Sequence, residues 1–108
     1  MPDGWLDGDG YPTEAALKGI KRWLVDTSGA RRDLMDFVKA LWWMPDWGWQ
    51  EFADKDATVY VLHTGGWSGN ESLIGALREN FLWWAMSWQA SRIGGHFEFR
   101  IKREVTDD

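Results

Sequence analysis

The sequence of 108 residues contains no cysteine, which excludes disulfide bonds, thiolate zinc sites and cysteine nucleophiles together. It also lacks a basic excess, because 12 Lys and Arg against 17 Asp and Glu give a net charge of -5. A protein that binds duplex nucleic acid needs a basic face toward the phosphates, so we expect no such partner. No apolar run approaches the ~20 residues of a membrane span, and no basic segment followed by an apolar run opens the chain. These absences predict a cytoplasmic protein without a membrane partner.

Recognisable catalytic signatures are scarce as well. His63 and His96 are the only histidines, and no His-Glu-x-x-His string is present. A metal site that combines them with Glu71 or Glu98 is therefore disfavoured. A hydrolytic triad built on Ser68 is disfavoured too, because no nucleophile-elbow motif surrounds this serine. We expect a protein that is not an enzyme and that has no catalytic residues, metal ions or cofactors.

The composition is that of a folded domain, with 44% apolar and 27% charged residues. We expect one domain over residues 12–103, after a loose lead-in at 1–11 and before an acidic tail at 104–108. Tryptophan is unusually frequent, and its 10 residues exceed what a core of this size needs. Some indoles should therefore lie at the surface, where they contact a partner or stack on a base. Such an excess also favours a small homo-oligomer.

The first half of the chain has the pattern of two helices followed by a strand. Apolar residues recur at helical spacing after the N-cap Thr13 and predict a helix that ends near residue 26. A second apolar face predicts a helix over 28–44, which Pro45 ends. The β-branched and aromatic segment 57–63 predicts the first strand.

The second half predicts a third helix and two strands. Ser68 and Glu71 have the spacing of a capping box and open a helix that ends near Asn80. Segment 82–90 fits either a longer helix or a strand with one apolar face, and we favour the strand because the segment is rich in aromatic residues. Regular alternation predicts a last strand over 96–103. The predicted fold is α+β, in the order α-α-β-α-β-β, with a mainly antiparallel three-stranded sheet packed on helices.

The turn between the first strand and the third helix is rich in glycine and forms the first candidate site. Its glycines let a ligand approach the backbone, and the N–H groups of Asn70 and Glu71 lie at the positive end of the helix dipole. This pattern predicts an anion cradle, although it lacks the Gly-Lys-Ser/Thr of a P-loop. The alternative is a tight turn whose capping box uses the same donors. The predicted ligand-binding residues are Thr64, Gly65, Gly66, Trp67, Ser68, Gly69, Asn70 and Glu71.

Two further segments carry candidate residues. Arg92 and His96 flank a second glycine turn, where they either hold a phosphate or belong to an ordinary hairpin. If both turns meet at one edge of the sheet, they form one site for an anionic small molecule or a nucleotide. The aromatic loop after the second helix is a stacking platform, a partner-binding patch or a lid over the core. Its predicted contact residues are Trp43, Trp47 and Trp49.

Three strings stand out beside the opening Tyr11-Pro12-Thr13-Glu14. They are Trp43-Met44-Pro45-Asp46-Trp47-Gly48-Trp49, Thr64 to Glu71, and Ser91-Arg92-Ile93-Gly94-Gly95-His96-Phe97. Together they resemble a family of small proteins encoded by bacteriophages and prophages, over roughly residues 11–101. The resemblance implies a phage accessory protein that acts in the cytoplasm of an infected bacterium.

With the tryptophan excess and the glycine turn, this resemblance leads to a functional hypothesis. We expect a binding protein that counteracts a bacterial defence, by binding either a nucleotide-type ligand or a defence protein. The alternatives are a small homo-oligomeric assembly accessory and, less favoured, a small enzyme that acts on nucleotides.

Overall fold

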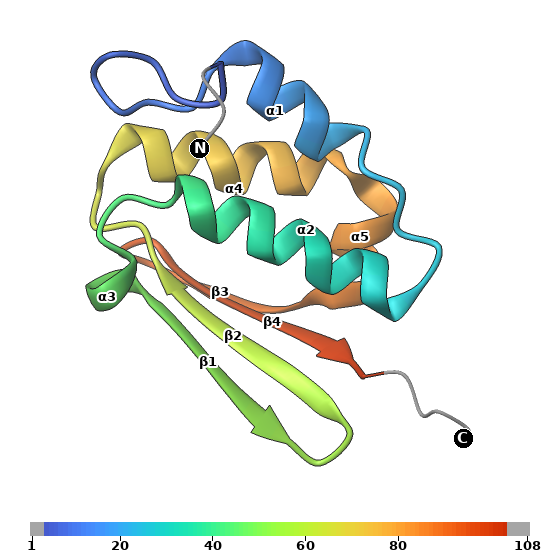
Figure 1. Cartoon of the computed structure of the whole chain (residues 1–108). Coiled ribbons are helices and arrows are strands. Elements are labelled where there is room, and N and C mark those ends of the chain that lie inside the picture. The colour runs from blue at the N-terminus through green and yellow to red at the C-terminus, as the bar shows by residue number, and fades with distance from the viewer. Residues whose placement is uncertain (1–3, 104–108) are drawn as a thin grey trace.

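Four antiparallel strands form one sheet, and helices cover one of its two faces (Figure 1). The computed structural model describes residues 4–103. The elements are α1 (Glu14–Lys21), α2 (Ser28–Leu41), α3 (Pro45–Gly48), β1 (Trp49–Asp54), β2 (Ala57–His63), α4 (Ser68–Glu79), α5 (Phe81–Ser87), β3 (Trp88–Arg92) and β4 (His96–Lys102). The strand order is β1-β2-β4-β3, so β1 and β3 are the edges. The predicted α+β domain is confirmed, but the predicted three-stranded sheet is wrong, because the sheet has four strands.

β1 is the additional strand. It begins at Trp49, within the segment predicted to be a loop, and pairs with β2 around a tight turn. Lys55 adopts a positive φ of 59° in this turn. Most of β1 is exposed, and its side chains lack the strong alternation of β4, so pairing with β2 rather than the local pattern makes this segment a strand.

α5 occupies most of the segment predicted as a strand, and only the end of that segment is β3. The buried Asn80 explains the helix. Its Oδ1 accepts the backbone N–H of Trp83 at 3.3 Å, which caps α5. Its Nδ2 donates to the carbonyls of Ile20 at 3.0 Å and Trp23 at 3.1 Å. The same side chain therefore starts a new helix and ties it to the end of α1.

Two helices end earlier than predicted. α1 ends at Lys21 rather than near residue 26. α2 ends at Leu41, because Trp42 is already extended with ψ of 133° and Met44 adopts a left-handed conformation. The residue before a proline is disfavoured in a right-handed helix, which accounts for the break before Pro45.

The predicted lead-in is packed where the structure describes it. Trp5 packs edge-on against Phe37 of α2, with ring centroids 5.3 Å apart. Leu6 forms an isolated antiparallel β-bridge with Pro12. The predicted acidic tail at 104–108 lies outside the described residues.

The core lies between the helices and one face of the sheet. Phe99 and Ile101 of β4 point toward the helices and are buried together with Tyr60 of β2 and Trp83 of α5. This confirms the predicted alternation of β4. The opposite face is uncovered over residues 4–103 (Figure 1). In that same range, no helix has the length and apolar character needed to cross a bilayer.

Candidate functional site

The two glycine turns meet at one end of the sheet, which is the arrangement that a single site would require. The backbone N–H of Thr64 donates to the carbonyl of Gly95 at 3.0 Å, and His63 pairs with His96 across β2 and β4. Thr64 is completely buried. A Cβ on Gly95 would lie 2.1 Å from Thr64 Oγ1, so this contact requires glycine. The meeting of the turns is therefore a packed contact.

Arg92 and His96 lie together, but the structure places them apart from Ser68 at the start of α4. Arg92 and His96 are paired neighbours on the uncovered face of the sheet, where both approach Glu98. His96 Nε2 lies 2.7 Å from Glu98 Oε2, and Arg92 Nη2 lies 3.9 Å from the same oxygen. Ser68 begins α4 on the helix-covered side. The sheet therefore separates Arg92 from Ser68, and the carboxylate of Glu98 already neighbours Arg92 and His96.

The first turn of α4 is covered by the indole of Trp67. A Cβ on Gly69 would lie 2.0 Å from Trp67 Cζ3, so the missing side chain lets the ring lie directly on the helix backbone. The N–H of Glu71, one of the predicted anion donors, instead donates to the carbonyl of Trp67 at 3.1 Å. Trp67 is the N-cap and no side chain caps the helix, so the predicted capping box of Ser68 and Glu71 is wrong.

Trp67 belongs to a stack of aromatic rings. Its ring stacks on Tyr11, with centroids 4.8 Å apart and planes 3° apart, and on Trp43, with centroids 5.4 Å apart and planes 24° apart. Tyr11 ends the first described loop, and Trp43 follows α2. The stack therefore joins three segments that are distant in the sequence.

Asn70 fixes the same junction with hydrogen bonds. Its side chain is 1% exposed. Oδ1 accepts the N–H of Trp43 at 2.9 Å, while Nδ2 donates to the carbonyls of Trp43 at 3.1 Å and Thr64 at 3.3 Å. The side chain of Asn70 therefore anchors the loop after α2 to the glycine turn.

Beside this junction lies an open pocket of about 290 Å³, lined by Trp43, Met44, Trp47 and Gly65. The three large side chains are half exposed, at 46%, 51% and 57% for Trp43, Met44 and Trp47. We call these four residues with Tyr11 and Trp67 the aromatic surface. Exposed aromatic and methionine side chains gathered around a hollow are typical of a binding site.

The short helix α3 sets the positions of these side chains. Met44 precedes it in the left-handed region, with φ of 59° and ψ of 53°, and Pro45 occupies its first turn. Gly48 ends it, where a Cβ would lie 2.4 Å from the carbonyl oxygen of His63. α3 therefore packs directly on the end of β2 and holds Trp47 beside the glycine turn.

Trp49 differs from the other predicted contact residues. It is 5% exposed, lies edge-on to Trp42 at 5.3 Å, and donates its Nε1–H to Glu51 at 2.7 Å. The prediction of a partner contact at Trp49 is therefore wrong, because Trp49 begins β1 on its inner face. Sequence reasoning did not select Met44 or Tyr11, although the Met-Pro step signals an unusual backbone before α3.

Three carboxylates lie on segments that carry or lead to residues of the aromatic surface. Asp46 lies in the first turn of α3, next to Trp47 in sequence. Asp7 and Asp9 lie in the loop that leads to Tyr11, where Asp7 Oδ1 accepts the N–H groups of Asp9 and Tyr11, each at 2.9 Å. Figure 1 places this loop, α3 and the glycine turn on the same side of the molecule.

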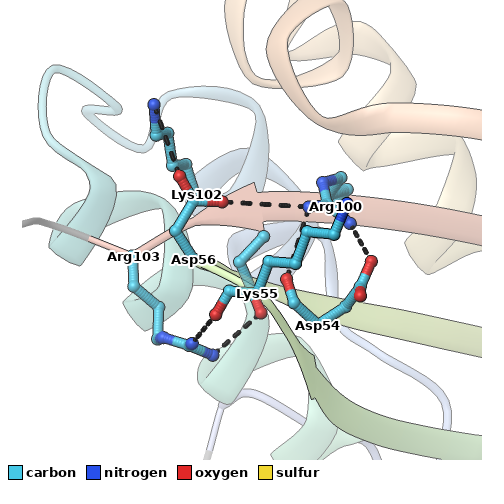
Figure 2. A network of polar contacts seen from close by, with 7 residues as sticks. Asp54, Lys55, Asp56, Arg100, Lys102 and Arg103 are labelled. Carbon is cyan, nitrogen blue, oxygen red and sulfur yellow. Dashed lines mark hydrogen bonds and ion pairs between the residues drawn. The ribbon is translucent and has the colours of Figure 1, made fainter.

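Basic side chains gather at the opposite end of β2, beside the β1–β2 turn (Figure 2). Arg100 Nη1 donates to Asp54 at 2.6 Å, and this hydrogen bond holds the pKa of the Asp54 carboxyl below its usual value. Asp56 lies 3.9 Å from Arg100 and 3.5 Å from Lys102. Because β2 has seven residues at ~3.3 Å each, these ion pairs lie roughly 20 Å from the aromatic surface.

A second pocket, also of about 290 Å³, lies on the other side of the glycine turns, between α4 and β4. Its lining residues are Glu71, Ile74, Gly75, Arg78, Gly95 and Phe97. The guanidinium of Arg78 lies 4.9 Å from the ring centroid of Trp84. With one carboxylate and one guanidinium, this pocket shows no preference for an anion.

Within residues 4–103, no three side chains of the metal-binding types are grouped so that they could hold a metal ion. Compared with protein-family models, curated proteins and solved structures, the chain shows no significant match.

Proposed function

We propose that this protein is a binding protein without catalytic activity, which a bacteriophage uses in the cytoplasm of the infected bacterium to block a host defence protein. The observation that supports this best is the exposure of Trp43, Met44 and Trp47 around an open pocket. Tryptophan and methionine are enriched at protein interfaces, and buried tryptophans contribute much of the binding energy there. The phage context comes from the resemblance of the three strings.

The conformation of Met44 supports the same proposal. A left-handed backbone costs about 1–2 kcal/mol for a residue with a side chain, and such residues are concentrated at functional sites. Here it places Met44 and Trp47 on either side of Pro45, both facing the pocket. Trp43 forms another wall of the pocket, and it is held by the hydrogen bonds of Asn70 and by stacking on Trp67. A rigid surface loses little conformational entropy when a partner binds.

A nucleotide-type ligand has less support. Arg92 and His96 neighbour Glu98, the first turn of α4 is covered, and the ring of Trp67 is stacked on two others. The pocket of about 290 Å³ is also just below the ~300–1,000 Å³ of small-molecule sites. Calorimetry against mono-, di- and cyclic nucleotides tests this alternative, and we expect no binding heat.

The decisive experiment for the protein-blocking function is a plaque assay. A panel of bacterial strains, each with one defence system, is infected with a sensitive phage, with and without expression of this protein. We expect restored plaque formation on at least one strain. The Trp47→Ser variant should lose the effect, whereas Leu24→Ser, at a side chain that is 78% exposed and lies outside the aromatic surface, should keep it. No restoration on any strain, or full activity of Trp47→Ser, would contradict the proposal.

One further observation favours a homo-oligomeric accessory as the second candidate. α5 and the start of β3 expose a separate apolar surface, with Phe81, Leu82, Met86 and Trp88 exposed at 81%, 58%, 50% and 43%. Patches of this kind are often buried in oligomers. Light scattering of the purified protein tests this candidate. A dimer that Leu82→Glu converts to a monomer would support it, and a monomeric wild type at high concentration would remove it.

A further inference from the structure

We propose that the pocket of Trp43, Met44, Trp47 and Gly65 binds a cationic side chain, the guanidinium of an arginine or the ammonium of a lysine, presented by a basic segment of the partner protein. The identity of the partner as a protein rests on the proposed function. The preference for a cation rests on the walls of the pocket, on its charge surroundings and on its size.

The walls are aromatic and converge on one point. A Cβ on Gly65 would lie 3.1 Å from Trp47 Cζ3 and 3.9 Å from Trp43 Cζ3, so the two indoles meet over a bare stretch of backbone. Trp67 stacks on Trp43 and does not itself line the pocket. Among the aromatic pairs of residues 4–103, Trp43 and Trp47 do not stack on each other. The space between them is open to a guest.

Such an arrangement attracts cations. The face of an aromatic ring is negative, and a cation within about 6 Å of its centroid is stabilised, most strongly by tryptophan. The attraction increases when the cation loses water, and the lining of this pocket is mostly apolar. The thioether of Met44 is polarisable and adapts to the shape of a guest. Groups of aromatic walls are the usual receptors for ammonium and guanidinium ions.

The charges near the pocket have the matching sign. Asp46 is adjacent to Trp47 in sequence, and Asp7 and Asp9 lie in the loop that leads to the stacked Tyr11. The whole chain has a net charge of -5. Arg100 and Lys102 of β4 are paired with carboxylates at the far end of the sheet (Figure 2). On the uncovered face nearer the pocket, the ring of His63 lies 6.0 Å from that of Trp47, and Arg92 and His96 both neighbour the carboxylate of Glu98. An anion would be repelled here, whereas a basic segment would be drawn to this end of the molecule.

The first experiment measures the preference for charge with small probes. Tetramethylammonium chloride and the neutral molecule tert-butanol, which has a similar shape, are titrated at constant ionic strength. The indole N–H resonances of the protein are followed by NMR. We expect saturable shifts of the Trp43 and Trp47 resonances with tetramethylammonium, and weaker binding of tert-butanol. Equal binding of the two probes, or no shift with either, would overturn the cation assignment.

The second experiment identifies the source of the cation. The peptide acetyl-Gly-Arg-Gly-amide is compared with the same peptide containing citrulline, which is neutral and nearly isosteric with arginine. We expect the arginine peptide to shift the same two resonances and the citrulline peptide to bind more weakly. Binding of tetramethylammonium without the arginine peptide would overturn the assignment to a protein side chain.

Variants connect the effect to the pocket. Trp47→Leu should weaken binding of the arginine peptide about two- to thirtyfold, the range expected for loss of one cation–π contact. Trp88→Leu is the control, because Trp88 is also an exposed indole, at 43% against 57% for Trp47, but does not line the pocket, and it should leave affinity unchanged. Asp46→Asn should reduce affinity and weaken its dependence on salt. Equal affinities of Trp47→Leu and the wild type would overturn the proposal.

The two proposals fail separately. If cations bind in the pocket but plaque formation is restored on no strain of the panel, the preference of the pocket for cations is supported and only the phage function is contradicted. If plaque formation is restored but neither probe nor peptide binds, the cation inference is overturned and the protein-blocking function stands.

Discussion

Replacement of Asn70 tests how the aromatic surface is held. Its side chain is 1% exposed and makes three hydrogen bonds, two to the backbone of Trp43 and one to that of Thr64. Each hydrogen bond contributes about 1 kcal/mol net, and a buried partner left unsatisfied costs about 1–3 kcal/mol. Asn70→Ala should therefore lower the free energy of unfolding by roughly 3 kcal/mol. This is a large fraction of the ~5–15 kcal/mol of an ordinary domain.

The Asn70→Asp variant isolates the role of the donor. One carboxylate oxygen still accepts the N–H of Trp43. The other faces the carbonyl oxygens of Trp43 and Thr64, to which the amide nitrogen of Asn70 donates at 3.1 and 3.3 Å in the wild type. Burial beside these oxygens should raise the pKa of the new carboxyl above its value of ~3.9 in the unfolded chain. A raised pKa in the folded state means that the stability is retained at low pH and lost as pH rises. The free energy of unfolding of Asn70→Asp should therefore lie closer to that of the wild type at pH 5 than at pH 8.

Urea unfolding followed by tryptophan fluorescence measures both variants, and the slope against urea should not change. Asn80→Ala is the matched control, because Asn80 also accepts from a tryptophan N–H and donates to two carbonyls, but on the far side of the domain. Both alanine variants should lose similar stability, yet only Asn70→Ala should shift the indole resonance of Trp43. A loss below about 1 kcal/mol for Asn70→Ala, or an unshifted Trp43, would refute this reasoning.

Three further predictions concern the backbone and charges. Met44→Gly should leave the free energy of unfolding unchanged or raise it by up to about 1 kcal/mol, because glycine tolerates the φ of 59°, while tetramethylammonium binding weakens in NMR titrations. Gly95→Ala should lower thermal stability by more than about 1 kcal/mol, since its Cβ would lie 2.1 Å from Thr64 Oγ1; an unchanged melting temperature would contradict this close contact. Arg100→Leu should raise the pKa of Asp54 in an NMR titration. Because the pKa of Asp54 is lowered in the folded state, its contribution to stability is present above pH ~4 and is lost as the pH falls. The free energy of unfolding of Arg100→Leu should therefore change less with pH in this acidic range than that of the wild type.

Local signals in the sequence predicted those features that neighbouring residues determine. Thr13 caps α1 as expected, because a threonine hydroxyl caps a helix by accepting an N–H only three residues away. The alternation of β4 was predicted correctly, since successive side chains of a strand point to opposite faces. The sequence did not determine whether the two glycine turns meet, because that depends on the pairing of β2 with β4, which brings His63 opposite His96.

The tertiary structure decided everything that depends on distant partners. β1 becomes a strand by pairing with β2, and α5 becomes a helix because Asn80 caps it while bonding to α1. The composition shows a surplus of tryptophan, but it does not determine which indoles are buried. Trp49 is buried and Trp47 exposed because of where the chain folds back after α3. Asn70 reaches Trp43 across 27 residues, a contact that leaves no periodicity in the sequence. The sequence by itself therefore determined the local elements and the aromatic excess, whereas burial by remote segments decided which aromatic side chains form the surface.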